Sequence, residues 1–176
     1  MSQTKSNSPQ NTDVFHHGVF KSPIGNLEIT SSTKGIRKII FMDSPITKVY
    51  KVFELIEECK KQLHEYFIGK RKHFNIPLDL HGTEFQKLVW MSLLTIPYGE
   101  SISYLKVAKL VGDPNSVRAV GMANNKNSIP IIIPCHRVIG SNGSLTGYAG
   151  GLWRKDWLIK HEHEYSNVDK QLDIFK

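Results

Sequence analysis

Cys135 and His136 are neighbouring residues whose types could carry out nucleophilic chemistry. A thiol attacks as its thiolate, and a nearby imidazole or guanidinium, such as those of His136 and Arg137, favours that form. Neighbouring side chains in an extended segment point to opposite sides, so a direct contact between Cys135 and His136 requires a bent backbone or a bridging water. From these residues alone, a reactive cysteine and a buried cysteine beside a surface histidine both stay open.

The segments around Cys135 are suited to holding it in place. An apolar run between Pro130 and Pro134 precedes it, and because proline lacks the donor that a sheet needs, this run is not a central strand. We expect the run to be buried and to bring the cysteine from the interior to a fixed position. The glycine-rich loop 140–151 follows, and its glycines permit close approach of the backbone to a ligand.

The sequence before this run predicts two short helices. The first covers about residues 103–111, and the second ends near Asn125, with Asp113 as its N-cap and Pro114 in its first turn. They form a candidate helix-turn-helix, and a helical hairpin packed only for stability is the alternative. Residues 101–140 contain five Lys or Arg and one Asp, a net charge of +4, which favours a nucleic-acid-binding surface.

Earlier segments predict the elements that frame these helices. Two β-type runs, Ile24–Thr30 and Ile36–Met42, indicate a hairpin-like meander. Apolar residues at three- and four-residue spacing over 52–67 predict a helix, and Cys59 lies in its apolar stripe as a core thiol. The pattern Thr83-Glu-Phe-Gln86 is typical of a capping box at the start of a further helix.

Length, composition and charge limit the function classes. The chain has 176 residues, 40% of them apolar and 22% charged, which suits one domain or two compact ones. No apolar run approaches the about 20 residues of a membrane helix, and the N-terminus lacks the pattern of a secretory signal, so we predict a cytoplasmic protein with no membrane partner. Two cysteines in a reducing compartment are read as thiols. The net charge of +7 is compatible with an acidic partner such as nucleic acid.

Shifts in composition predict the domain organisation. Residues 1–13 are rich in Ser, Asn, Gln and Thr and indicate a flexible tail. An N-terminal α/β domain is predicted over 14–80 and a C-terminal domain over 81–165, which ends in a helix at about 152–162. Residues 166–176 are predicted to form a C-terminal tail.

The stretch Pro134-Cys-His-Arg-Val138 resembles the active-site signature of the O6-alkylguanine-DNA alkyltransferases. The likeness runs from about Ser22 to Glu162 and is dense after Gly82. Further matches follow in the family's order: Gly82-Thr83-x-Phe85-Gln86, Pro97-x-Gly99, Ser103-Tyr104, Arg118-Ala119-Val120-Gly121 and Asn127.

This resemblance implies a fold and an activity. The implied fold class is α/β (α+β): a small N-terminal ribonuclease-H-like sheet with a helix, and a C-terminal winged-helix-like helix-turn-helix domain that carries the active site. Cys135 would take a methyl or other alkyl group from O6 of guanine, and from O4 of thymine, in a single irreversible turnover. The implied partner is double-stranded DNA that contains O6-alkylguanine, bound through its minor groove by a monomer. No cofactor and no metal is implied, since the ligand set of the zinc found in some relatives is not visible.

The resemblance also implies roles for individual residues. His136 would act as base through a water, Glu162 would orient its imidazole, and Asn127 would brace the active-site turn. Tyr104 would donate to the leaving base and assist flipping, while Arg118 would enter the base stack as a finger. Val138, Ser141, Tyr148, Ala149 and Gly150 would line the alkyl pocket, and Ala119, Gly121, Ala123, Thr83 and Gln86 would contact DNA.

Other interpretations stay open beside this one. A catalytically silent relative would bind alkylated DNA and recruit repair factors, although such proteins lack the nucleophile that Cys135 supplies. A cysteine hydrolase or acyltransferase would act on a different substrate. His161 and His163 have a spacing that metal ligands can use, but without a thiol or carboxylate cluster they are better read as solvated residues of a tail.

Overall fold

A computed structural model describes residues 14–43 and 50–173 of the chain, so the predicted tail at 1–13 lies outside the described residues. Its first part is an antiparallel meander of strands β1 (His16–Ser22), β2 (Gly25–Ser31) and β3 (Ile36–Met42), in that order. The two predicted strands are confirmed as β2 and β3. Strand β1 was not predicted, because its segment contains two histidines and a glycine and lacks a continuous apolar pattern.

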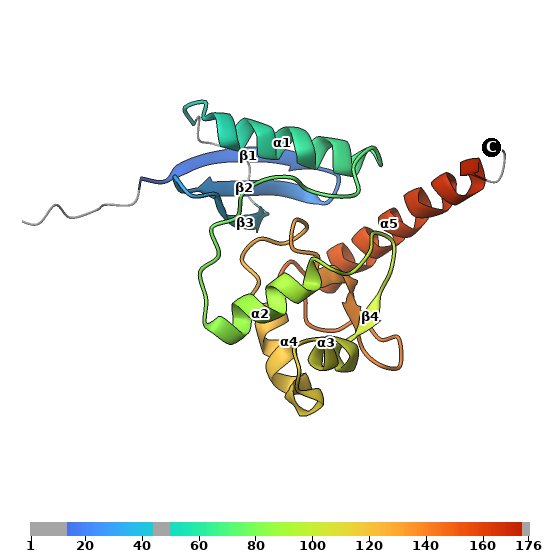
Figure 1. The fold of residues 1–176 in the computed structure, drawn as a ribbon. Helices are drawn as coiled ribbons and strands as arrows, with labels where there is room; N and C mark the ends of the chain where they lie inside the picture. The colour runs from blue at the N-terminus through green and yellow to red at the C-terminus, as the bar shows by residue number, and fades with distance from the viewer. Residues whose placement is uncertain (1–13, 44–49, 174–176) are drawn as a thin grey trace, which may run out of the picture.

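Helix α1 (Glu54–Phe67) covers one face of this sheet (Figure 1). Its apolar stripe is the one that the residue spacing predicts, and Cys59 within it is a buried free thiol. Burial raises the pKa of Cys59 to about 12, so this thiol stays protonated at neutral pH. Gly18 on β1 lets the helix approach closely, because a Cβ there would collide with Ile56.

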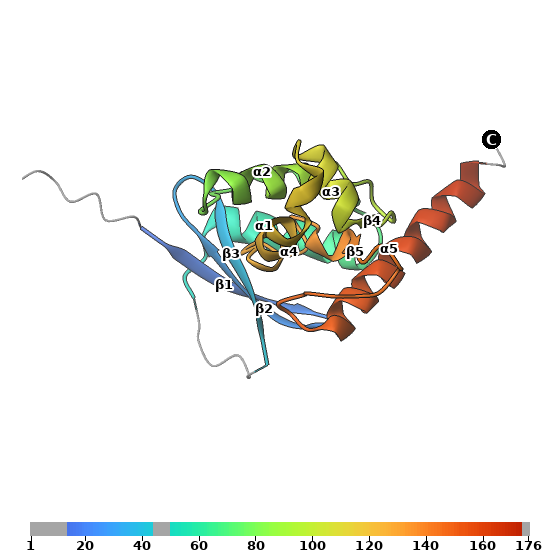
Figure 2. The same ribbon diagram turned by 90° about the horizontal axis from the view of Figure 1, so that it is seen from below.

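The C-terminal part is a cluster of helices that gathers beyond β3 (Figures 1 and 2). The predicted capping box of Thr83 and Gln86 is present at the start of the first of these helices. Trp90 Nε1 donates to the Ala123 carbonyl at 2.8 Å, which fixes that helix against the helix carrying Ala123. The elements are α2 (Glu84–Leu93), β4 (Ile102–Ser103), α3 (Tyr104–Leu110), α4 (Val117–Asn125), β5 (Val138–Ile139) and α5 (Leu152–Asp173), with β4 and β5 paired in parallel.

Helices α3 and α4 are joined by the predicted turn. Gly112 adopts a positive φ of 94°, and the Asp113 carboxylate accepts a hydrogen bond from Asn115 N at 2.9 Å. Asp113 caps a single 3-10 turn, Pro114–Ser116, and the α-helix begins only at Val117. The two helices therefore form the helix-turn-helix that the sequence predicts.

Strand β3 links the two parts of the molecule. Ile36 exchanges backbone hydrogen bonds with the connector, from Ile36 N to Pro77 O and from Asp79 N to Ile36 O, both at 2.8 Å. Ile39 N donates to Ser128 O at 2.8 Å, so the outer edge of β3 reaches the segment that leads to Cys135. The sheet is therefore fixed directly against the candidate site.

Helix α5 runs out beyond the helical cluster toward the C-terminus (Figures 1 and 2). The prediction that it ends near Glu162 and that residues 166–176 form a tail is wrong over 166–173, which are helical. Neither Gly nor Pro interrupts residues 152–173, and extending an existing helix costs little compared with nucleating one. Across the described part of the chain, none of the helices has the length and apolar character to cross a membrane.

Candidate active site

Cys135 lies at the start of a single 3-10 turn, Cys135–Arg137. The backbone is therefore bent, not extended, between Cys135 and His136. The apolar run before it also folds back on itself, with Ile133 N donating to Ile129 O at 3.0 Å. Within that turn Ile131 adopts a φ of 75°, which is rare for a β-branched residue and persists only where the surroundings enforce it. The run delivers Cys135 from the core through a tight turn.

Asn127 spans this turn with its side chain. Its Nδ2 donates to Ile133 O at 2.9 Å, and its Oδ1 accepts from Ile129 N at 2.9 Å. A second amide, Asn124 Nδ2, donates to the Cys135 carbonyl at 3.3 Å. Both asparagines are buried, so they fix the backbone on which the cysteine is mounted.

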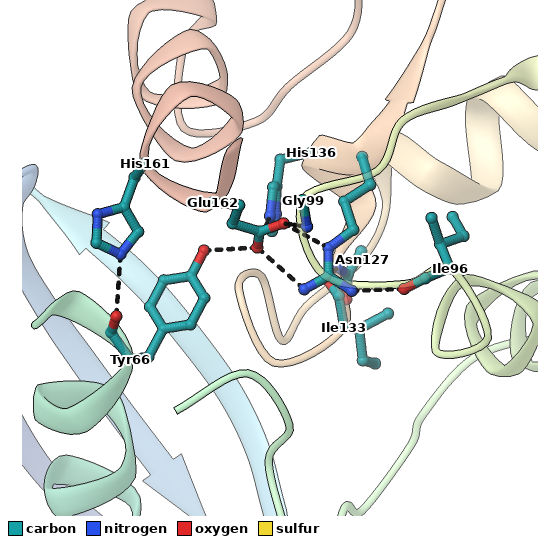
Figure 3. A network of polar contacts seen from close by, with 9 residues as sticks. Tyr66, Ile96, Gly99, Asn127, Ile133, His136, His161 and Glu162 are labelled. Carbon is teal, nitrogen blue, oxygen red and sulfur yellow. Dashed lines mark hydrogen bonds and ion pairs between the residues drawn. The ribbon is translucent and has the colours of Figure 1, made fainter. Parts of the chain in front are cut away.

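Glu162 of α5 is the centre of a buried polar network (Figure 3). Its carboxylate accepts from Tyr66 Oη at 2.7 Å, from Gly99 N at 3.2 Å and from the Nε and Nη2 atoms of Arg137 at 2.8 and 3.0 Å. It also meets His136 Nε2 at 2.8 Å. Burial alone would raise the pKa of Glu162, but His136 and Arg137 hold it far below its usual range. Glu162 is therefore ionised at neutral pH.

This network determines which nitrogen of His136 can act as a base. Nε2 faces Glu162, so we assign the proton of the neutral ring to Nε2 and the free electron pair to Nδ1. Nδ1 is buried and has no hydrogen-bond partner among the described residues. Burial lowers the pKa of His136 below its usual range, against the opposite pull of Glu162, so the ring is neutral at rest.

Cys135 lines a cavity of about 210 Å³ and is only 4% exposed. Burial raises the pKa of its thiol to about 11, while a hydrogen bond from Asn127 and the charge of Lys155 act to lower it. A thiol with this pKa needs a base when it reacts at neutral pH. The cavity walls come from three segments: Lys38 to Phe41; Asn124, Asn125, Asn127, Ser128 and Pro130; and Tyr148 to Gly150.

Several of these side chains were not singled out from the sequence. Tyr66 lies in the apolar stripe of α1, and no local signal marks its hydroxyl as a partner of Glu162, 96 residues away. Arg137 was predicted only to activate Cys135. In the structure its guanidinium donates to Glu162 and also to the Ile96 carbonyl, the latter at 2.6 Å. The position of Arg137 directly after His136 was the one feature of the sequence that could have indicated its part in this network.

Lys155 is a further buried residue that the sequence did not reveal. Its ammonium donates to Val138 O at 2.6 Å and to Thr146 O at 2.7 Å, and it lies 3.5 Å from Tyr104 Oη. Burial lowers the pKa of Lys155 to about 8, and the charge of an ionised Cys135 opposes that shift. Through these two hydrogen bonds Lys155 connects the glycine-rich loop with β5, near Cys135.

The structure places the predicted pocket residues in two groups. Tyr148, Ala149 and Gly150 line the Cys135 cavity, whereas Val138 and Ser141 do not. Val138 is fully buried and Ser141 is exposed on the loop. The opposite wall is supplied by β3, which the sequence did not connect with the pocket.

The predicted DNA-contacting residues of α4 differ in their exposure. Arg118 and Ala119 are exposed on α4, and Gly121 is half-buried beside Tyr104, since a Cβ added at Gly121 would lie 4.0 Å from two atoms of the Tyr104 ring. Ala123 is 2% exposed and packs in the core beside Val120, so its placement on a DNA-contacting surface is wrong. It lies three residues after Val120 and therefore shares the inner face of the helix.

Three more predicted residues have clear surroundings. Tyr104 Oη donates to Thr146 O at 3.1 Å, at the rim of the glycine-rich loop. Thr83 and Gln86 bond each other in the capping box, Thr83 N to Gln86 Oε1 at 2.9 Å and Gln86 N to Thr83 Oγ1 at 3.2 Å. Thr83 is exposed and Gln86 half-buried, so both remain near the surface.

His161 is not a solvated residue. It is buried, its Nε2 lies 2.9 Å from the Tyr66 carbonyl, and its ring stacks on Trp157 with centroids 4.8 Å apart. The interpretation of a solvated tail is wrong here, because α5 packs against α1 at this point. Within the described ranges no group of three or more His, Cys, Asp or Glu is placed to hold a metal ion.

Fold and site together define a class: a two-part α/β protein in which a helix-turn-helix stands beside a buried Cys-His-Glu arrangement. The family model of the 6-O-methylguanine DNA methyltransferase ribonuclease-like domain matches residues 15–80, and that of the DNA binding domain matches residues 84–164. The chain belongs to the 6-O-methylguanine DNA methyltransferase family.

Individual relatives agree with this assignment. A methylated-DNA--protein-cysteine methyltransferase of Methanosarcina acetivorans is 46% identical over 154 residues, which cover 84% of this chain and 98% of that protein. The constitutive enzyme of that name from Bacillus subtilis is 59% identical over 95 residues, which cover 54% of this chain and 58% of the relative. The crystal structure of Mycobacterium tuberculosis OGT in complex with DNA aligns with a TM-score of 0.78 at 42% identity, over 85% of this chain and 94% of that one.

Proposed function

We propose that this protein repairs DNA by moving a methyl or other alkyl group from O6 of guanine, or O4 of thymine, to the Sγ atom of Cys135. The observation that carries the proposal is the arrangement at the cavity: Cys135 in its wall, and His136 held by Glu162 with Nδ1 left free. Support for the DNA substrate comes from the family and from the DNA complex of the Mycobacterium tuberculosis relative.

The transfer is a single displacement at the alkyl carbon. The Cys135 thiol loses its proton through a water to His136 Nδ1, and Glu162 stabilises the imidazolium that forms. The S–C bond forms as the C–O6 bond breaks, and the electron pair of that bond stays with the guanine. Tyr104 Oη supplies a proton to the leaving base, and solvent then reprotonates Tyr104. The thioether has no leaving group, so each chain reacts once.

A lesion inside a duplex cannot meet a buried thiol, so the target nucleotide must be flipped out of the stack. We assign docking in the minor groove to the surface of α3 and α4, where Ala119 and Gly121 let the backbone come close. Arg118 fills the space that the flipped base leaves. Binding of this kind follows shape and backbone, with little preference for sequence.

The remaining assignments are part of the same proposal. The two domains meet near residue 80, and the protein acts as a monomer in the cytoplasm. Support for this boundary comes from the two family models, which match residues 15–80 and 84–164. The Cys135 cavity accounts for the chemistry with side chains alone, so the reaction as proposed draws on no cofactor.

DNA with a labelled methyl group on guanine O6 tests the proposal. We expect label on the protein, at one group per chain, with none on a Cys135→Ala variant. Cys59→Ala is the matched control and should label fully, because Cys59 is a buried core residue of α1. Binding of the DNA without any label would favour the silent relative, and repeated release of product would favour a hydrolase; either result would overturn the proposal.

A further inference from the structure

Strand β3 of the N-terminal part forms one wall of the cavity that holds Cys135. Ile39 and Phe41 line the cavity together with Pro130 and Tyr148, which gives it an apolar side. The backbone of Ile39 is fixed there by its hydrogen bond to Ser128 O. The wall is therefore part of the folded body, and it comes from a segment almost 100 residues before the cysteine.

The ring of Phe41 is confined from several directions. Its centroid lies 6.2 Å from that of Tyr148 in a tilted arrangement. Gly150 packs directly on it, since a Cβ at that position would lie 2.7 Å from two ring atoms of Phe41. Both contacts belong to the glycine-rich loop, so Phe41 sets how close this loop approaches β3.

Arg154 of α5 holds this arrangement together. Its guanidinium carbon lies 4.7 Å from the centroid of the Phe41 ring. The same side chain donates to Ile24 O at 2.8 Å, to Gly150 O at 2.7 Å and to Asp43 Oδ1 at 2.8 Å. Because Arg154 is buried and makes these three hydrogen bonds, it holds the Phe41 ring in a fixed position. Moving the ring would disturb contacts with both the sheet and the glycine-rich loop.

We infer that Phe41 is a specificity-determining residue that limits the size of the group transferred to Cys135. This inference rests on the proposed function. The cavity of about 210 Å³ is small compared with the ~300–1,000 Å³ of pockets that take drug-sized ligands, so a flipped base fills much of it. A methyl group stays beside Cys135, whereas an apolar group of benzyl size extends toward Ile39 and Phe41.

The test compares transfer rates from two oligonucleotides, one with O6-methylguanine and one with O6-benzylguanine. For Phe41→Ala we expect the benzyl-to-methyl rate ratio to rise at least about tenfold, since pocket discrimination by a few carbon atoms is of that order. For Phe41→Trp we expect the ratio to fall. Phe20→Ala is the matched control: Phe20 stacks on Phe67, away from the cavity, and the ratio should stay at the wild-type value.

Two results would overturn the inference or the function on which it rests, and a third would change which variants are compared. If both Phe41 variants are folded by thermal unfolding and keep the wild-type ratio, Phe41 does not set the size limit. If Phe41→Ala fails to fold, Phe41→Leu and Phe41→Trp decide the question by the same ratio. If the wild-type protein accepts no group from either oligonucleotide, the proposed function itself fails, a result distinct from an unchanged ratio.

Discussion

Glu162 is the residue on which most of the buried polar contacts converge. Its two oxygens are shared between a tyrosine, a histidine, an arginine and a backbone amide, so the loss of any partner changes the contacts of a buried charge. A carboxylate placed in this way fixes both the orientation and the tautomer of His136. The histidine can then take a proton only at Nδ1, the nitrogen that does not face Glu162.

Removal of the Arg137 guanidinium should expose this dependence. Arg137→Met leaves a buried carboxylate with fewer partners and an unpaired Ile96 carbonyl, so we expect the free energy of unfolding to fall by about 3–5 kcal/mol. Urea denaturation at pH 7 measures it. Arg71→Met breaks a pair with Glu65 that is partly open to solvent and should cost no more than about 1 kcal/mol. Equal losses in the two variants would contradict the role of Arg137.

At the scale of elements, the turn before Cys135 shows how a short segment holds a strained conformation. Ile131 tolerates a positive φ because Asn127 bonds both ends of the turn and because its side chain is fully buried. The hydrogen bonds that hold this turn come from the chain itself, so the position of the cysteine does not depend on contacts with a substrate. Preorganisation of this kind spares the reaction a conformational cost.

An Asn127→Ala variant tests this bracing. It leaves Ile129 N–H and Ile133 C=O buried without partners, and each unsatisfied group costs about 1–3 kcal/mol, so we expect a loss of roughly 2–5 kcal/mol in the free energy of unfolding. Asn125→Ala, at the exposed end of α4, serves as control and should change stability little. A stability close to wild type for Asn127→Ala would show that core packing alone maintains the turn.

The elements that could be predicted from the sequence are those whose signals lie within a few neighbouring residues. The strands β2 and β3, the stripe of α1, the capping box of α2 and the Gly-Asp-Pro turn all depend on near neighbours. The length of α5 was missed because its outer half has no apolar stripe. Within the site, Cys135 and His136 stood out as a motif, whereas Tyr66 and Phe41 enter it through tertiary contacts that no spacing along the chain encodes.

For the molecule as a whole, the site is shared between its two parts. Tyr66 of α1 bonds Glu162 of α5, and β3 supplies a wall of the cavity and bonds Ser128. The N-terminal sheet therefore supports the active site directly. Unfolding of either part would disrupt the Glu162 network, so we expect both parts to unfold together, and the charge state of that network should govern the stability of the entire chain.

That stability should fall in acid. The unfolded chain binds protons at about pH 6.5 for His136 and about pH 4.3 for Glu162, whereas the folded protein holds the pKa of each below those values. Stability is thus present above these pH values and is lost as the pH falls through them, by up to about 1.4 kcal/mol per pH unit for each proton.

Urea denaturation at intervals from pH 7 to pH 3 measures this dependence. The Glu162→Gln protein should be less stable at pH 7, because Arg137 loses its charged partner. Its free energy of unfolding should, however, fall less steeply between pH 5 and pH 3, because one carboxylate that binds a proton on unfolding is gone. Asp156→Asn, which removes an exposed partner of Lys160, should keep the wild-type slope. A Glu162→Gln protein with the wild-type slope would mean that other carboxylates drive the acid transition, among them Asp79, whose pKa is also lowered: burial opposes that shift, and hydrogen bonds from Ser32 and Arg37 outweigh it.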